Sequence, residues 1–168
     1  AGRRCRSGSR NGIWRSRRRI HCHHAALKTL SNYDKPLPAP TTESQAYWDG
    51  LKKHKLLFQC CRQCRKVRHY PRPVCDHCFS MVYDWVESSG RGKVYSWTVN
   101  HHGFHPGFKS EIPYVTVTAD MEEGVRVQAP LVGTDEAKVS IDLAVEVFFE
   151  DATSEITLPR FRAITGSV

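Results

Sequence analysis

Apolar and polar residues alternate along most of the chain after residue 80. The alternating segments cover residues 81–87, 93–101, 114–120, 125–129 and 144–149, with a shorter one at 156–158. They are rich in β-branched and aromatic residues, and the polar turns between them leave no room for crossover helices. This pattern predicts a mainly β protein whose C-terminal part is a small antiparallel barrel, and a five-stranded OB-fold fits it best.

A short helix is predicted ahead of the strands. Lys35–Pro40 is a proline-spaced segment, which favours an extended linker because proline interrupts a helix. Thr42–Gln45 then has the capping-box pattern, and Tyr47 and Leu51 supply the apolar face of the helix that follows. We interpret Tyr47 and Trp48 as residues that pack this helix against the body, although large aromatic residues also serve as contacts for partner proteins.

Two Cys-x-x-Cys pairs lie between the helix and the barrel. The pairs Cys61–Cys64 and Cys75–Cys78 are separated by ten residues, enough for a short strand, a turn and a return. Two such turns complete a tetrahedron of thiolates that leaves no open position for a substrate. The spacing therefore predicts a structural zinc ion, and the alternatives are a rubredoxin-like iron site with the same ligands or a pair of disulfides. Cys60 stands outside this set, since its spacing to Cys64 is one residue too long.

The net charge of +8 is concentrated at the N-terminus. Residues 1–26 contain eight arginines and no acidic residue, so the rest of the chain is formally neutral. This stretch has no hydrophobic period and is predicted to be disordered. We interpret residues 1–28 as a non-native leader, and the alternatives are a nucleic-acid-binding arm and an organelle transit peptide.

The predicted organisation has four parts. They are the disordered basic leader (1–28), a linker with the helix (29–56), the zinc ribbon (57–87) and the OB-fold domain (88–168). No apolar run approaches the roughly 20 residues of a membrane span, so we expect a cytoplasmic protein without a membrane partner. Formation of a homo-oligomer stays open.

Several longer motifs join these elements. They are Leu57–Cys64, Pro71–Cys78, Gly90–Val99, Ile112–Val115 and Leu158–Arg162. In this combination the chain resembles, over about residues 35 to 163, the zinc-ribbon plus OB-fold family of acyl-CoA-associated proteins known as domain of unknown function thirty-five. The resemblance implies a helical N-terminal segment, a rubredoxin-like ribbon and a C-terminal OB barrel. One departure is Ile141–Leu143, where the family usually carries a glycine before the last strand.

The resemblance also implies a role. Members of this family are typically partners of thiolase-like enzymes, in complexes that make or break carbon–carbon bonds of acyl-CoA thioesters, and their OB domain is thought to receive or channel the thioester. We therefore expect a non-catalytic acyl-CoA-binding or scaffolding protein in lipid or polyketide metabolism. Its expected partners are acyl-CoA and a thiolase-like protein.

Two groups of residues are candidates for binding such a ligand. Basic side chains around the ribbon can hold the phosphates of CoA, unless they form only a solvated surface. These are Arg62, Arg65, Lys66, Arg68 and Arg72. The long loop between the predicted strands 93–101 and 114–120 offers Phe104 and Phe108 as an apolar slot for the pantetheine arm or acyl tail, with His102 beside them. Histidines of this loop are also candidates for acid–base chemistry or a second metal, and an ordinary exposed loop is the remaining alternative.

Two other functions compete with this one. An OB-fold can bind single-stranded nucleic acid, but residues 88–168 hold seven basic and eleven acidic residues, so a surface that tracks phosphates is not expected there. The other alternative is an enzyme acting on CoA thioesters. The sequence contains neither a Gly-x-Ser-x-Gly elbow nor a phosphate-binding Gly-x-x-x-x-Gly-Lys loop, which disfavours that hypothesis.

Overall fold

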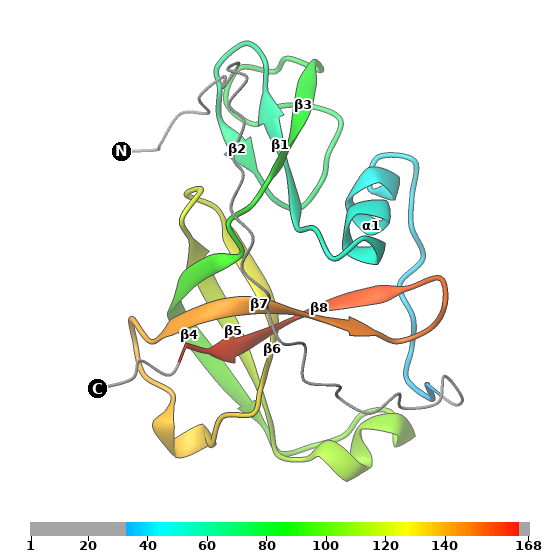
Figure 1. Ribbon diagram of the computed structural model, residues 1–168, viewed down its shortest axis with the longest axis vertical. Coiled ribbons are helices and arrows are strands. Elements are labelled where there is room, and N and C mark those ends of the chain that lie inside the picture. Colours follow the sequence, from blue (N-terminus) through cyan, green and yellow to red (C-terminus); the bar gives the residue numbers. More distant parts are fainter. Residues whose placement is uncertain (1–32, 165–168) are drawn as a thin grey trace, which may run out of the picture.

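The computed structural model describes residues 33–164, which form a small three-stranded sheet, a five-stranded barrel and one helix at their junction (Figure 1). The predicted leader, residues 1–28, lies outside the described residues. In chain order the elements are α1 (Gln45–Lys52), β1 (Leu57–Cys61), β2 (Val67–Arg68), β3 (Tyr83–Glu87), β4 (Arg91–Asn100), η1 (Pro106–Glu111), β5 (Tyr114–Met121), β6 (Arg126–Val132), η2 (Glu136–Lys138), β7 (Ala144–Asp151) and β8 (Thr157–Ala163). The predicted mainly β architecture, a ribbon followed by an OB barrel, is confirmed.

The helix begins two residues later than the predicted capping box places it, with Ser44 and not Thr42 at the N-cap. The backbone N–H of Thr41 donates to Oγ of Ser44 at 2.9 Å, and the N–H of Ser44 donates to the carbonyl of Thr41 at 3.0 Å. These two bonds close a turn ahead of the helix and do not form a capping box, because no side chain of the described residues accepts from the backbone N–H groups of the first helical turn. Gly50 sits where a Cβ would lie 2.7 Å from Cδ1 of Leu57, so the missing side chain lets the helix approach the first strand closely.

Two aromatic residues of α1 contact the ribbon. Tyr47 is buried, and its ring lies 5.5 Å from that of His69 and 5.4 Å from that of Tyr70. The indole N–H of Trp48 donates to the hydroxyl of Tyr70 at 2.9 Å. Tyr47 therefore packs the helix onto the body, as the sequence predicts.

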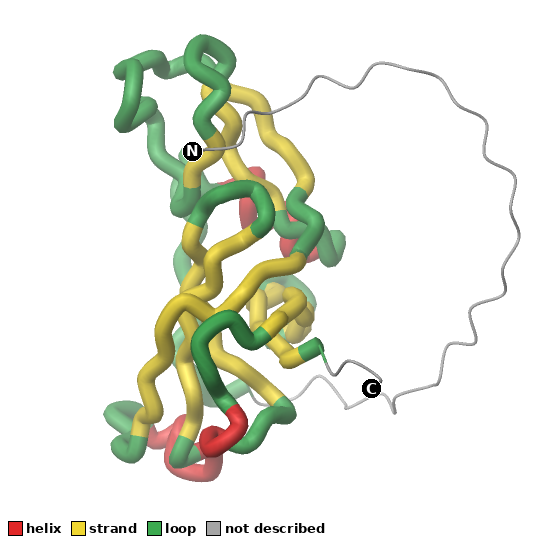
Figure 2. The backbone as a smooth tube through the Cα atoms, turned by 90° about the vertical axis from the view of Figure 1, so that its left-hand side faces the viewer, coloured by secondary structure: helices red, strands yellow, loops and turns green. Residues whose placement is uncertain are grey.

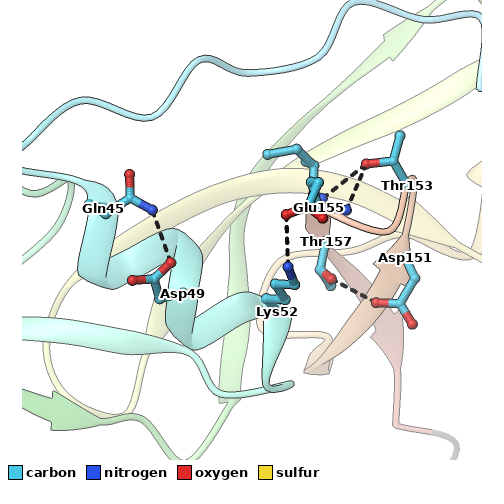
Figure 3. Close-up of polar contacts among 8 residues, drawn as sticks. Gln45, Asp49, Lys52, Asp151, Thr153, Glu155 and Thr157 are labelled. Carbon is cyan, nitrogen blue, oxygen red and sulfur yellow. Dashed lines mark hydrogen bonds and ion pairs between the residues drawn. The ribbon is translucent and has the colours of Figure 1, made fainter.

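The other side of the helix contacts the hairpin that joins β7 to β8 (Figure 3). Lys52 Nζ lies 2.9 Å from Oε2 of Glu155, near the tip of that hairpin. Below it, Oγ1 of Thr157 donates to Oδ1 of Asp151 at 2.7 Å, and Nε2 of His54 lies 3.0 Å from the same carboxylate. These contacts place the helix between the ribbon and the barrel.

The barrel closes in the order β4-β5-β6-β8-β7. All neighbours are antiparallel except β6 and β8, which pair in parallel through Leu131 with Phe161 and Val132 with Arg162. The register of β4 shifts between Val94 and Ser96, a bulge that bends the strand as barrel closure requires. The predicted five-stranded OB-fold is thus present.

One hydrophobic core runs through the barrel and the junction. Inward positions alternate along the strands, for example Val115, Val117 and Ala119 of β5, and the same cluster continues through Leu51 and Phe58. This continuity explains why helix, ribbon and barrel hold together: each buries apolar surface against the others.

The turn before β7 accommodates the departure from the family pattern. Asp142 adopts φ = 63°, the left-handed conformation that a glycine takes without strain, and aspartate tolerates it better than most residues. The N–H of Asp142 donates to the carbonyl of Val94 at 2.9 Å, so the turn is held against β4.

The ribbon and the 3-10 helices η1 and η2 lie at opposite ends of the long axis (Figures 1 and 2). Within residues 33–164, no helix is long and apolar enough to cross a membrane.

Candidate functional site

The four cysteines of the two Cys-x-x-Cys pairs converge at the tip of the ribbon. Their Sγ atoms all lie within 4.8 Å of one another, with 3.5 Å between Cys61 and Cys78 and 3.6 Å between Cys64 and Cys75. A tetrahedron of thiolates at about 2.3 Å from Zn²⁺ has sulfur–sulfur edges of about 3.8 Å, so the cluster fits a structural zinc ion. Cys61 and Cys75 are buried and the other two half-buried, which encloses the site.

Both turns around the metal site have the same backbone design. In the first, the N–H of Cys61 donates to the carbonyl of Lys66 and the N–H of Arg65 donates to the carbonyl of Cys61, both at 2.9 Å. In the second, the N–H of Cys75 donates to Ser80 at 2.9 Å and that of Phe79 donates to Cys75 at 3.0 Å. The residue after each second cysteine is left-handed, with φ = 62° at Arg65 and 59° at Phe79. We call these two turns the first and second knuckle.

Backbone N–H groups inside the knuckles favour the thiolate form. Those of Cys64 and Gln63 lower the pKa of Cys61, although burial acts against them. At Cys75, burial acts to raise the pKa, but N–H donors from Cys78 and His77 outweigh it and lower the pKa to about 6. Cys78 differs: the backbone N–H of Ser80 acts to lower its pKa, but burial and the neighbouring sulfurs of the cluster raise it to about 12. The ribbon therefore favours the thiolate at Cys61 and Cys75, and the charge of a bound cation would favour it at the fourth sulfur.

Cys60 points away from this cluster. It is buried in β1, and its Sγ lies 3.8 Å from the carbonyl oxygen of Arg65. The four clustered sulfurs are those that the Cys-x-x-Cys spacing indicates, without Cys60.

The basic residues predicted to bind phosphates lie around the ribbon in different environments. Arg62 pairs with Asp84 through Nε at 2.8 Å, and Lys66 pairs with Asp76 at 3.0 Å. Arg72 is exposed, and Arg65 occupies the left-handed position of the first knuckle. The phosphate-binding role of these residues stays a prediction.

Arg68 differs from the other four because its guanidinium lies inside the ribbon. It is 3% exposed, its Nε donates to Oε1 of Gln59 at 2.7 Å, and its Nη2 donates to the carbonyl of Arg72 at 3.1 Å. The ring of Tyr83 lies 5.1 Å from the guanidinium carbon. These contacts stabilise the ribbon.

The aromatic loop between β4 and β5 separates its two phenylalanines. Phe104 is 91% exposed. Within the described part of the chain its one ring contact is with His102, whose ring centre lies 4.7 Å from that of Phe104. Phe108 is half-buried in η1 and stacks on Tyr114 at 5.5 Å. Lys35 lies 5.2 Å above the Phe108 ring and forms an ion pair with Glu111, so the linker packs against this loop.

Phe108 lines a groove of about 680 Å³ at the end of the barrel opposite the ribbon. The groove lies between η1, the start of β5, the end of β6 and the β7–β8 pair. Its apolar walls include Phe108, Tyr114, Leu131 and Phe148, and its charged residues are Glu111, Asp135, Glu136, Glu150 and Arg160. Arg160 is 8% exposed and donates from Nε to Glu150 at 2.6 Å.

Most of these groove residues escape a sequence-based search. Phe148 and Arg160 are cross-strand partners on β7 and β8, while Tyr114 begins β5, so only the closed barrel brings them together. One signal was available: Phe148 and Phe149 are adjacent in an alternating strand, so one of them must face outward. Of the predicted ligand residues, only Phe108 lies at the groove, and the ribbon residues lie at the far end of the molecule.

Comparison with known proteins matches both halves of the structure. Residues 48–82 match the family described as "ChsH2, rubredoxin-like zinc ribbon domain", and residues 85–150 match "ChsH2, C-terminal OB-fold domain". A chain of the solved structure described as "Ltp2-ChsH2(DUF35) aldolase" is 38% identical, with a TM-score of 0.70, and the match covers 76% of this chain and 98% of that one.

Two curated relatives support the same assignment. A probable enoyl-CoA hydratase alpha subunit of Thermomonospora curvata is 39% identical over 76% of this chain, and the match spans only 40% of that longer protein. A DUF35 domain-containing scaffold protein of Methanocaldococcus jannaschii is 30% identical over 61% of this chain and 73% of its own length. The ribbon and the barrel both match proteins of this kind. The chain therefore belongs to the DUF35 family.

Proposed function

We propose that this chain is a non-catalytic accessory subunit that binds acyl-CoA, or scaffolds the complex in which it reacts, beside a thiolase-like enzyme. The observation that carries the proposal is the 38% identity that extends over 98% of a chain in the Ltp2-ChsH2(DUF35) aldolase. Another relative is named a probable enoyl-CoA hydratase alpha subunit, which is also one subunit of an enzyme that acts on a CoA thioester.

The metal site supports a structural role for the ribbon. Four thiolates fill a tetrahedral coordination shell, so the ion has no open position at which to polarise a carbonyl or activate water. Zinc would instead hold two knuckles that are too short to fold by burial alone.

The groove supports binding of the apolar part of a thioester. Its aromatic and aliphatic walls suit an acyl chain or the pantetheine arm, and Arg160 together with Glu150 offers polar contacts at one position. Its acidic residues Glu111, Asp135 and Glu136 disfavour the phosphates of CoA. In this proposal the nucleotide lies outside the groove.

The experiment is a calorimetric titration of the zinc-loaded chain at physiological salt. Ligands are CoA, a short acyl-CoA, a long acyl-CoA and a single-stranded oligonucleotide. Saturable binding that strengthens with acyl length supports the carrier role, because each buried CH₂ adds about 0.8 kcal/mol. Oligonucleotide binding tighter than acyl-CoA binding would favour the nucleic-acid hypothesis, and acyl-CoA turnover by the chain alone would make it an enzyme. Silence from all four ligands would leave only the scaffolding form of the proposal.

A further inference from the structure

Arg68 carries a buried positive charge whose hydrogen-bond acceptors are both neutral. The side chain donates to Oε1 of Gln59 and to the backbone carbonyl of Arg72, and the residue is 3% exposed. The buried Nη1 atom of Arg68 meets no acceptor in residues 33–164. Moving a cation out of water is costly unless a negative charge compensates it. The ribbon should therefore contain such a charge close to Arg68.

The carboxylates of the ribbon do not supply this charge. Residues 57–87 hold three acidic residues, and each of them forms an ion pair with another basic side chain at the surface. These pairs are Lys55–Glu87, Arg62–Asp84 and Lys66–Asp76. None of the ion pairs within residues 33–164 includes Arg68.

The four cysteines form a site with an excess of negative charge once a metal is bound. Four thiolates around Zn²⁺ have a formal net charge of −2, because their charges outweigh that of the ion. The same holds for iron(II) in a rubredoxin-like site. A small ribbon thus contains an anionic metal centre and a buried cation, each without an opposite charge among the carboxylates and cations that pair at its surface.

Strand register places the cation beside one of the metal ligands. The strand order is β2-β1-β3, with Arg68 of β2 opposite Gln59 of β1. Tyr83 of β3 is opposite Cys61 of β1. Because Gln59 and Cys61 are two residues apart, these four side chains share one face of the sheet. The guanidinium carbon of Arg68 lies 5.1 Å from the Tyr83 ring. Arg68 therefore extends across β1, and its path runs between Gln59 and Cys61.

The guanidinium also reaches the segment that leads to the second knuckle. Its Nη2 donates at 3.1 Å to the carbonyl of Arg72, three residues before Cys75. Side chains that are diagonal neighbours on adjacent strands, as Arg68 and Cys61 are, lie about 7–8 Å apart. At that separation, opposite charges inside a protein attract strongly enough to change a binding equilibrium by about tenfold or more.

We propose that Arg68 is the counter-charge of the metal centre, so that its buried guanidinium strengthens metal binding by the four cysteines without contacting the metal. The cation and the anionic centre each reduce the cost of burying the other. In this role Arg68 is not available for the phosphates of CoA. The inference does not depend on acyl-CoA binding.

The first test is the zinc affinity of the full chain, measured by competition with a chromogenic chelator at neutral pH. Arg68→Met should weaken zinc binding at least tenfold, because methionine keeps an unbranched apolar side chain but removes the charge. Arg68→Lys should stay within threefold of the parent, because lysine retains the charge. A loss of packing could also weaken zinc binding, so a second measurement is needed that responds to charge.

The reduction potential of the iron-substituted full chain is that measurement. Four thiolates give iron(III) a net charge of −1 and iron(II) a net charge of −2, so a nearby cation favours the reduced form. Arg68→Met should reduce the preference for iron(II) about tenfold, which lowers the potential by about 59 mV for one electron. Gln59→Leu is the matched control, because it disturbs the same hydrogen bonds but keeps the cation. Its potential should equal that of the parent even where its stability falls.

A second variant covers the case in which Arg68→Met does not fold. Gln59→Glu has almost the parent shape and places a negative charge against the guanidinium, so it should also lower the potential. Parent-like potentials in Arg68→Met or, where that variant does not fold, in Gln59→Glu would reject the proposal. An equal decrease in Arg68→Lys would assign the effect to the guanidinium hydrogen bonds, and an equal decrease in Gln59→Leu would assign it to packing. Either result would overturn the role of the charge.

Discussion

The Nε atom of Arg68 donates a 2.7 Å hydrogen bond to Oε1 of Gln59, and both side chains are buried in the ribbon. The same oxygen accepts the backbone N–H of Arg72 at 3.0 Å. One neutral amide therefore connects β1, β2 and the segment that leads to the second knuckle. Because the guanidinium stays charged, its position depends on this acceptor.

Gln59→Leu should destabilise the protein by about 2–3 kcal/mol, because it leaves a buried charged donor and a backbone N–H without their acceptor. Urea unfolding of the zinc-loaded chain measures this loss. Gln63→Leu is the control: Gln63 is exposed in the first knuckle, and its substitution should cost less than about 0.5 kcal/mol. Equal losses in the two variants would mean that the Gln59 amide does not support the buried arginine.

The metal site predicts which cysteines control zinc content. Cys78→Ser should bind less than one zinc ion per chain, because a serine hydroxyl is a poor substitute for the fourth thiolate. Cys60→Ala should retain one, since Cys60 lies outside the four-sulfur cluster. Elemental analysis after dialysis measures both, and it also distinguishes zinc from iron. Zinc loss in Cys60→Ala with zinc retained in Cys78→Ser would reverse the ligand assignment.

Local patterns in the sequence were sufficient for the strands and the metal site. Alternation predicted the barrel strands because one face of each is buried, as Val115, Val117 and Ala119 of β5 show. Paired Cys-x-x-Cys turns predicted the metal cluster because each turn sets its own geometry through local hydrogen bonds. The helix start was displaced by two residues, from Thr42 to Ser44, since both have side chains able to cap and the sequence does not choose between them.

Features that depend on distant residues could not be predicted in the same way. Arg68 was grouped with the surface arginines, but its acceptor lies on another strand, at Gln59. The groove joins Phe108 to Phe148 and Arg160 only through closure of the barrel. Likewise, the residue types of Arg65 and Phe79 give no sign that both have a left-handed backbone, which only the folded knuckles show.

Burial of His69 predicts an acid-sensitive ribbon. Burial, with a smaller contribution from Arg72, lowers the pKa of His69 to about 4 from its usual 6.5. The unfolded chain therefore binds a proton between pH 6.5 and 4 that the folded chain does not, so stability from this group is present above pH 6.5 and is lost as pH falls toward 4. The loss should be about 2–3 kcal/mol.

The variant His69→Phe isolates this contribution, because phenylalanine can keep the ring contacts with Tyr47 and Phe58 but does not titrate. Urea unfolding of both proteins at pH 7 and pH 4 gives the comparison. The parent should lose about 2–3 kcal/mol more than the variant over this interval, while acid effects on the zinc thiolates are common to both. Parallel losses would show that His69 is accessible to protons in the folded state.

If the groove binds the acyl chain, the two phenylalanines of the β4–β5 loop should differ in their effect on acyl-CoA binding. Phe108 lines the groove, whereas Phe104 is 91% exposed and lies outside the groove lining. Phe108→Ala should therefore weaken long-chain acyl-CoA binding about tenfold or more, since a ring buried against ligand contributes about 1.5–3 kcal/mol. Phe104→Ala should change it little, and CoA without an acyl group should bind both variants alike if its nucleotide lies outside the groove. Calorimetry with matched acyl lengths makes the comparison. A larger loss in Phe104→Ala would move the acyl site from the groove to the exposed tip of the loop, where the sequence alone had allowed either residue to bind.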